Sequence, residues 1–389
     1  MRDAVVVEAV RTPMGKGKPN GALAHVHPVE LLAHTLRTLV ERSGVDPALI
    51  DDVIGGTVDQ VGEQAMNTTR YALLSAGFPE SVPATTVDRQ CGSSQQAVHF
   101  AAQGVIAGAY DLVVACGVES MSRVPMWSNV PPGADPFGPG VAARYPEGLV
   151  PQGISAELIA AKWSLTRERM DAFAVSSHQK AAAAWDTGRF DAEIAPLDGV
   201  SRDECVRPDT GVEVLAGLRP AYHDPAFAER FPQIEWNVTA GNASPVNDGA
   251  SAVLITSSET AARLGLRPLA RLHSFAVTGS DPLLMLTGVV LATEKVLRRA
   301  SLSLGDIDLF EVNEAFASVV LAWQQETGAD LGKVNVHGGA IALGHPLGAS
   351  GTRLTTTLVH ALHERGGRYG LQTMCEAGGL ANAMILEAV

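Results

Sequence analysis

Two short stretches far apart in the chain decide the fold: LVVAC at residues 112–116 and LQTMC at residues 371–375. Both are largely apolar runs of strand length, and each follows a helical stretch that contains glycine. A second pair, IDDVI at residues 50–54 and IDLFEV at residues 307–312, repeats the relation in the same order and at nearly the same separation. Two ordered matches indicate a duplicated α/β unit.

The segments around these strands alternate between short apolar runs and longer helical patterns, which is typical of the α/β class. Residues 5–7 predict a strand, and residues 29–43 predict a helix with one apolar face. Residues 52–56 predict a strand that ends in glycines, and residues 96–107 predict a further helix. The first half therefore reads as strands joined by helices.

Between the two similar halves lies a stretch of different composition. Residues 122–153 are rich in proline and glycine, and a charged helical region and then irregular sequence follow them. Long insertions in compact enzymes often carry binding sites. We therefore expect one half formed by residues 1–121 and 241–268, an insertion at residues 122–240 that covers the sheet, and a second half at residues 269–389.

Composition excludes several classes of protein. With 46% hydrophobic and 18% charged residues, the 389-residue chain can bury a sizeable core, so it is neither disordered nor fibrous. A net charge of -13 argues against a nucleic-acid-binding protein or one bound to an anionic membrane. No apolar run reaches the length of a membrane helix, and the first residues lack a signal-peptide pattern. Four cysteines cannot form a disulfide framework, so we expect a reducing cytoplasm.

Cys91 is the first candidate for chemistry. In TVDRQCGSS, residues 86–94, a predicted strand leads sharply into a helix with Cys91 at the turn. A helix N-terminus lowers the pKa of a thiol and offers N–H groups to an oxyanion, the logic of a nucleophile elbow. A small buried residue at a strand end explains the same pattern, and these residues alone leave both interpretations open.

His345 and Cys375 are the other candidates. His345 stands among glycines in NVHGGAIALGHPLGASG, residues 335–351, where a phosphate-binding loop would need Lys and then Ser or Thr. A histidine in this setting is more typical of a base than of a structural residue. Cys375 ends a buried strand before glycines, whereas Cys116 at the matching place of the first half reads as a small core residue. Cys205 has no argument for function, and zinc is disfavoured because no Cys-x-x-Cys pair or fourth ligand is present.

Together with NEAF at residues 313–316 and GNAS at residues 241–244, these three segments resemble the thiolase family over nearly the whole chain. The resemblance implies a thiolase fold of two βαβαβαββ halves in five αβαβα layers, with a loop domain for CoA and acyl groups inserted in the first half. It also implies an acyltransferase that reversibly cleaves a 3-ketoacyl-CoA with CoA into acetyl-CoA and a shortened acyl-CoA through a cysteine acyl-enzyme.

The resemblance assigns roles to individual residues. It implies that Cys91 is the nucleophile, that His345 activates it, and that Cys375 is the second acid/base. A water held by Asn313 together with His345 would bind the enolate oxygen. The backbone N–H groups of Cys91 and Ala377 would bind the oxyanion of the acyl-enzyme. Coenzyme A is implied as a substrate, and no tightly bound cofactor or metal is expected.

Substrate contacts follow by position in the same resemblance. Arg207 matches an arginine at the nucleotide end of CoA, although an ordinary solvated charge would look the same. Ser244 matches a serine that bonds the pantetheine arm. Gln152 stands where short-chain members have methionine, so we expect a different acyl pocket. Two further departures are Ala377, where a glycine is usual and a positive φ would strain alanine, and His337, where asparagine is common.

Two other functions remain open from the sequence. One is the short-chain biosynthetic thiolase that joins two acetyl-CoA into acetoacetyl-CoA, since sequence does not set the direction of an equilibrium. The other is a non-catalytic acyl-CoA or lipid-binding member of the fold, which the presence of Cys91, His345 and Cys375 disfavours. A decarboxylating condensing enzyme fits the glycine-rich histidine segment less well. A homodimer is favoured over a homotetramer.

Overall fold

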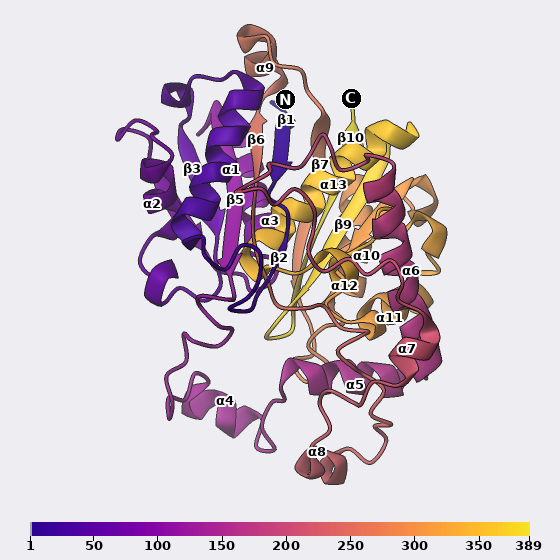
Figure 1. Ribbon diagram of the computed structural model, residues 1–389. Helices are drawn as coiled ribbons and strands as arrows, with labels where there is room; N and C mark the ends of the chain where they lie inside the picture. The colour runs from indigo at the N-terminus through magenta and orange to yellow at the C-terminus, as the bar shows by residue number, and fades with distance from the viewer. Residues whose placement is uncertain (1) are drawn as a thin grey trace.

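The computed structural model describes residues 2–389, whose strands form a ten-stranded mixed sheet in two similar parts (Figure 1). The strands are β1 (Val5–Arg11), β2 (Gly15–Lys16), β3 (Asp52–Gly56), β4 (Ala84–Val87), β5 (Leu112–Ser120), β6 (Asn247–Thr256), β7 (Ala270–Gly279), β8 (Leu309–Val312), β9 (Tyr369–Glu376) and β10 (Leu380–Ala388). Their order is β4-β3-β5-β6-β1-β7-β10-β9-β8, and β2 pairs with β6. The predicted strands at residues 5–7, 52–56 and 112–116 are therefore confirmed.

The two parts of the sheet follow the same plan. In the first, β3 and β5 are parallel and β6 runs antiparallel to β5; in the second, β8 and β9 are parallel and β10 runs antiparallel to β9. The parts meet where Val5 pairs with Arg271 and Val6 with Ala270. The predicted duplication is confirmed, with one difference: opposite the outer edge of β8, a single bridge between Phe310 and Val334 takes the place that β4 holds beside β3.

Helices separate and cover the two parts of the sheet. They are α1 (Pro28–Ser43), α2 (Thr68–Ser75), α3 (Ser93–Ala107), α4 (Gly138–Arg144), α5 (Gln152–Lys162), α6 (Arg167–Asp186), α7 (Val212–Ala216), α8 (Pro225–Arg230), α9 (Ser258–Leu264), α10 (Gly288–Ala300), α11 (Ala317–Thr327), α12 (Ala340–Leu343) and α13 (Ser350–Arg365). The helix predicted for residues 29–43 is α1, and the one predicted from residue 96 begins three residues earlier, immediately after the Cys91 turn.

The alternation of side chains along β5 sorts the helices into layers. Val113 and Ala115 pack with α3 and α13, which form the central layer between the two parts of the sheet (Figure 1). Leu112 and Val114 point to the other face, where α1 and α2 cover them. Helices α10 and α11 cover the outer face of the second part. Because each sheet face is apolar, five layers result, as expected.

The segment between β5 and β6 crosses to the second part of the sheet. Its helices α5 and α6 pack against α11, while α4 lies away from the body of the molecule (Figure 1). A buried ion pair anchors this segment to β1: Nε of Arg11 lies 2.6 Å from Glu193, and Nη1 lies 2.7 Å from Asp203. Removing one partner of such a buried pair would leave a charge uncompensated, so the contact fixes the path of the chain near residue 205.

Across residues 2–389, no helix is both long and apolar enough to cross a membrane.

Candidate active site

A tight turn between β4 and α3 holds Cys91. Gln90 has a φ of 49°, a left-handed conformation that non-glycine residues rarely adopt. Asp88 stabilises it by accepting a hydrogen bond from the backbone N–H of Gln90 at 2.6 Å. The hydroxyl of Ser93 donates to the Gln90 carbonyl at 2.6 Å and accepts from the N–H of Arg89 at 2.9 Å. The predicted elbow is present, with its strain at the residue before the cysteine.

The electrostatic surroundings of Cys91 differ from the expectation for a helix N-terminus. The thiol is buried, and burial, followed by the charge of Glu376, raises its pKa to about 12. A hydrogen bond from the side chain of Gln152 acts in the opposite direction. Removal of water from the thiolate therefore outweighs the helix dipole, which falls off within the first turn. The resting protein holds a neutral thiol here, and the expected lowering of its pKa was wrong for this state.

Neighbouring hydrogen bonds fix the orientation of the His345 ring. Ser350 Oγ lies 2.6 Å from Nδ1 of His345 and donates its own hydrogen to the carbonyl of Pro346 at 2.8 Å. Its hydroxyl must therefore accept from Nδ1–H, because it has only one hydrogen to give. Burial, and the nearby charge of Arg353, lower the pKa of His345 to about 3. The ring is neutral, with an unprotonated Nε2.

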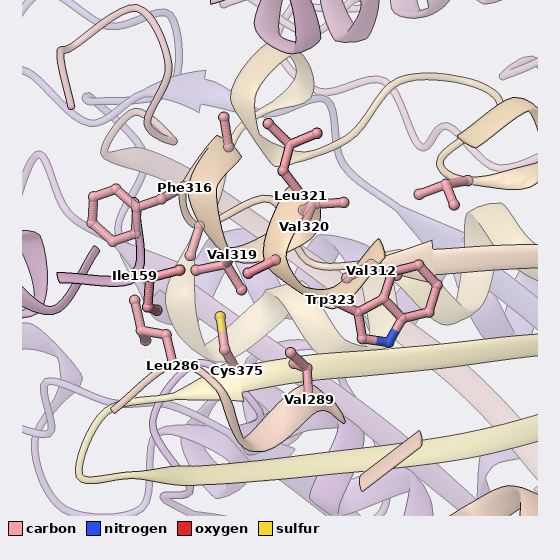
Figure 2. Close-up of a cluster of buried hydrophobic side chains, with 14 of the residues drawn as sticks. Ile159, Leu286, Val289, Val312, Phe316, Val319, Val320, Leu321, Trp323 and Cys375 are labelled. Atoms are coloured by element: carbon pink, nitrogen blue, oxygen red, sulfur yellow. The ribbon is translucent and has the colours of Figure 1, made fainter. Parts of the chain in front are cut away.

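Cys375, at the end of β9, lies on the sheet face that α10 and α11 cover. Figure 2 shows it among apolar side chains that include Ile159, Leu286 and Val319. Burial raises its pKa well above the usual value, and a charge on Cys91 would raise it further. The two thiols are thus close enough to influence each other, and a hydrogen bond from Asn313 favours the thiolate of Cys375.

Asn313 connects Cys375 with His345. Its Nδ2 lies 3.4 Å from Nε2 of His345 and its side chain also bonds to Cys375, while Oδ1 is without a partner in the part of the chain that the structure describes. Asn313 thus connects Cys375 and His345, Cys91 lies close enough to Cys375 for their charges to interact, and Gln152 bonds to Cys91. Residues 2–389 show no hydrogen bond between Cys91 and His345. The set combines two thiols, a neutral imidazole acceptor and an amide donor.

The remaining predicted residues differ in their burial and in their contacts. The backbone N–H of Ser244 donates to the carbonyl of Ala315 at 2.9 Å, which places Ser244 beside the segment that carries Asn313. Arg207 is exposed, and its backbone N–H donates to Nδ1 of His178 at 3.2 Å. The expected strain at Ala377 is absent because the positive φ angles of this turn belong to Gly378 (82°) and Gly379 (78°).

His337 does not titrate near neutral pH. The side chain is buried beside Glu364, with Nε2 3.1 Å from its carboxylate, but desolvation and the charge of Arg365 lower the pKa of His337 to about 4. This departure from the usual asparagine therefore places a neutral ring here. Cys116 lies in the apolar layer under α1 and α2, as its interpretation as a core residue predicts.

Two residues that position His345 were not singled out from the sequence. Asn247 Oδ1 accepts the backbone N–H of His345 at 2.9 Å, and its amide donates to the carbonyl of Gly15 and, at 3.3 Å, to the sulfur of Cys205. Ser350 fixes the ring as described above. Ser350 could have been found from the sequence, since its hydroxyl lies five residues after the histidine in the same glycine-rich segment. Asn247 carries no such signal, because it lies on a distant strand.

Metal ligands are not gathered at this site. Within residues 2–389, no group of three or more His, Cys, Asp or Glu side chains is arranged to hold a metal ion. All four cysteines are free and buried. The chemistry that the set offers is therefore that of a thiol nucleophile and of proton transfer between sulfur and nitrogen.

Comparison with known proteins agrees with this chemistry. The model of the thiolase N-terminal domain matches residues 4–259, and that of the thiolase C-terminal domain matches residues 266–388. A steroid 3-ketoacyl-CoA thiolase of Mycobacterium tuberculosis is 46% identical over 100% of this chain and 94% of its own length. A 3-ketoacyl-CoA thiolase of Bacillus subtilis is 42% identical, with 100% of both chains covered.

Solved structures give the same result for the fold. The acetyl-CoA acetyltransferase of Bacillus anthracis superposes with a TM-score of 0.89 at 38% identity, covering 100% of this chain and 99% of that one. Human mitochondrial 3-ketoacyl-CoA thiolase in complex with CoA has a TM-score of 0.89 at 37% identity, covering 100% and 98%.

Proposed function

This chain belongs to the thiolase family and is an acyltransferase, and we propose that it cleaves a 3-ketoacyl-CoA with CoA into acetyl-CoA and a shortened acyl-CoA. The observation that carries the proposal is the connected set of Cys91, Cys375, Asn313 and His345. A thiol and a neutral imidazole in contact through one amide, with a second thiol close to the first, are what an exchange between a carbon–carbon bond and a thioester requires. The named relatives support the same reaction.

The first half-reaction forms the acyl-enzyme on Cys91. Nε2 of His345 accepts the thiol proton as the sulfur attacks the 3-keto carbonyl. The bond between the α- and β-carbons then breaks, and its electron pair remains on the α-carbon as the enolate of acetyl-CoA. Because the resting Cys91 is a neutral thiol, proton transfer accompanies attack rather than preceding it.

Cys375 supplies the proton that completes acetyl-CoA. Its thiol protonates the α-carbon, and the resulting thiolate takes the proton of the incoming CoA thiol. CoA then displaces the acyl group from Cys91, and His345 returns the proton to the Cys91 sulfur. Burial keeps both sulfurs out of water, which strengthens each charge interaction and prevents hydrolysis of the thioester.

Backbone and amide groups stabilise the negative charge that develops on oxygen. We place the N–H groups of Cys91 and Ala377 at the oxyanion of the acyl-enzyme, and His345 with Asn313 at the enolate oxygen. The unpartnered Oδ1 of Asn313 supports a role in holding a water there. Ala377 is not among the residues with a positive φ, so alanine occupies this position without that strain and its N–H can take the proposed role.

The substrate contacts are also proposals. Ser244 lies beside the segment of Asn313, so its hydroxyl can reach a pantetheine arm that leads to Cys91. Exposed Arg207 suits the phosphates at the nucleotide end. Gln152 is at the start of α5 and bonds to Cys91, so it would line the acyl pocket next to the nucleophile. Residues 122–240 would act as the loop domain that binds CoA and acyl groups, between halves formed by residues 1–121 with 241–268 and residues 269–389.

The acyl group is proposed to be longer or bulkier than acetoacetyl. The polar Gln152 supports this, as does the steroid substrate in the name of one relative. Rates of thiolysis across a panel of 3-ketoacyl-CoA chain lengths test it, with ring-bearing esters as a further group. Preference for acetoacetyl-CoA, together with efficient condensation of two acetyl-CoA, would instead favour the biosynthetic alternative. The similarity to an acetyl-CoA acetyltransferase structure is the observation that supports this alternative.

The edge of the sheet at β4 supports a homodimer. Helices α2 and α3 flank this edge strand and expose Tyr71, Leu74 and Phe100, with the 77% exposed side chain of Met66 next to Tyr71. A sheet edge bordered by apolar side chains is a surface that a second copy can cover. Light scattering of the purified protein distinguishes the proposed dimer from a monomer or tetramer.

We also propose a cytoplasmic location, which the four free cysteines support.

A further inference from the structure

Glu376 is a buried acid beside the proposed nucleophile, and the reaction described above does not use it. It follows Cys375 on β9, and because side chains alternate along a strand, it points to the opposite face, toward α3. Its exposed fraction is 0%, and neither carboxyl oxygen has a hydrogen-bond partner within residues 2–389. Burying an unpaired acid destabilises a fold, so stability does not explain its presence.

The carboxyl group of Glu376 packs against the residue that follows Cys91. A Cβ atom added to Gly92 would lie 2.0 Å from Oε1 of Glu376 and 2.7 Å from Nδ2 of Asn382. Asn382, on β10, donates through that nitrogen to the carbonyl of Gly92 at 3.0 Å. Two side chains of the second half therefore enclose the N-cap of α3 in the first half, and a residue larger than glycine would have to displace them.

We propose that Glu376, together with Asn382, is a positioning residue that holds the Gly92 end of α3 and thereby sets the place and the reactivity of the Cys91 thiol. The inference rests on the proposed role of Cys91 as the nucleophile. Asn382 supplies the directional contact, the hydrogen bond to the Gly92 carbonyl. Glu376 supplies a close-packed neutral group whose charge state acts on the thiol beside it.

The charge state follows from the groups that face Glu376. Burial and the charge of Asp88 raise its pKa well above the usual value, while Arg89 acts in the opposite direction. Strand β10 contributes only the uncharged Asn382. In its neutral form, Glu376 exerts no charge repulsion on the Cys91 thiolate. Once ionised, it raises the pKa of Cys91, and it does the same to Cys375. Loss of one proton at Glu376 therefore makes both thiols harder to ionise.

The test compares wild type with Glu376→Gln, which keeps the shape and removes the charge. The rate of alkylation of Cys91 by iodoacetamide is followed by mass spectrometry of the Cys91 peptide from about pH 6.5 to about pH 10, because below its pKa the small reactive thiolate fraction rises with pH. The ratio of the variant rate to the wild-type rate should rise with pH, by about tenfold if ionised Glu376 shifts the Cys91 pKa by about one unit. A ratio that stays constant over this range overturns the proposal.

Matched variants separate positioning from general damage. Glu8→Gln removes another carboxyl whose pKa is raised by burial, on β1, and should leave the ratio flat; a slope in this variant would count against the inference. Glu376→Leu replaces the acid if the glutamine variant does not fold, and it should give the same rising ratio. Asn382→Ala should lower the alkylation rate at every pH, because the Gly92 carbonyl loses its donor; an unchanged rate removes Asn382 from the proposal.

The outcome is separable from the proposed function itself. If wild type neither cleaves 3-ketoacyl-CoA nor forms an acyl adduct on Cys91, the thiolase mechanism fails, whatever the alkylation ratio. If wild type does both and the ratio stays flat, only the role of Glu376 fails.

Discussion

Ser350 Oγ lies 2.6 Å from Nδ1 of His345, at the start of the helix that crosses the centre of the molecule. Because the hydroxyl already donates to the carbonyl of Pro346, it can only accept from the ring. This contact selects the tautomer with an unprotonated Nε2, the nitrogen that faces Asn313. One hydroxyl thereby decides whether the histidine can act as a base.

Ser350→Ala should lower kcat by about 10- to 100-fold, part of the usual contribution of a general base, because the ring can then adopt the wrong tautomer. KM should change little, since the hydroxyl touches no substrate. Thr356→Val, which removes a hydroxyl bonded within the same helix, is the control. Steady-state thiolysis checks both variants, and an unchanged kcat in Ser350→Ala would show that the tautomer is fixed by other contacts.

Cys91→Ala should abolish turnover while binding of CoA esters persists, because the sulfur acts in bond formation more than in affinity. Incubating wild type with an acyl-CoA should add the mass of the acyl group to the Cys91 peptide. Intact-protein and peptide mass spectrometry follow the adduct, with Cys116→Ala as the control for a buried structural thiol. An adduct on Cys375 or Cys116 instead would overturn the assignment.

Cys375→Ser should separate the two half-reactions. Acyl transfer to Cys91 should remain partly intact, whereas exchange of the α-proton of acetyl-CoA with solvent should be suppressed, because a serine hydroxyl is too weak an acid near neutral pH. Deuterium incorporation into acetyl-CoA measures the second process. Equal loss in both half-reactions would mean that Cys375 is structural.

Gln152→Met should shift preference toward acetoacetyl-CoA, because the apolar side chain restores the residue found in short-chain members. The values of kcat/KM for acetoacetyl-CoA and for a medium-chain 3-ketoacyl-CoA are compared in both proteins. Loss of the hydrogen bond to Cys91 should also slow both substrates together. If the ratio of the two values stays within a factor of about two, less than about 0.5 kcal/mol, Gln152 does not determine the pocket.

His99→Leu should make stability less sensitive to acid. Burial lowers the pKa of His99 to about 3, and its Nε2 has no partner within residues 2–389. Below the unfolded pKa of 6.5, the unfolded chain binds a proton that the folded chain excludes, so this residue destabilises the wild type as pH falls. The variant should gain up to about 1.4 kcal/mol over wild type per pH unit between about pH 6 and about pH 4. Chemical denaturation at several pH values measures the difference, and a constant difference would contradict the assignment.

Much of the fold could be predicted because the local periodicity of apolar side chains indicates its strands and helices. The apolar runs that become β5 and β9 and their repeated order require only side-chain alternation and helix spacing, which neighbouring residues set. The candidates Cys91, His345 and Cys375 were recognisable for a similar reason: the first two stand next to a glycine, and Cys375 lies at the end of a strand shortly before two glycines. The bounds of the insertion, which its proline and glycine content indicated, stay a prediction.

The sequence by itself determined the elements, their duplication and the candidates for the reacting groups. Only the tertiary structure decided their protonation and orientation. The pKa of Cys91 is raised rather than lowered because burial removes water from the elbow and the charge of Glu376 opposes ionisation. The backbone of His345 is held by Asn247, which is distant in the sequence, and Gly92 is enclosed by Glu376 and Asn382. Such contacts depend on which faces of the two halves meet. Desolvation at a residue depends on all of its neighbours in space, which a local sequence pattern does not contain.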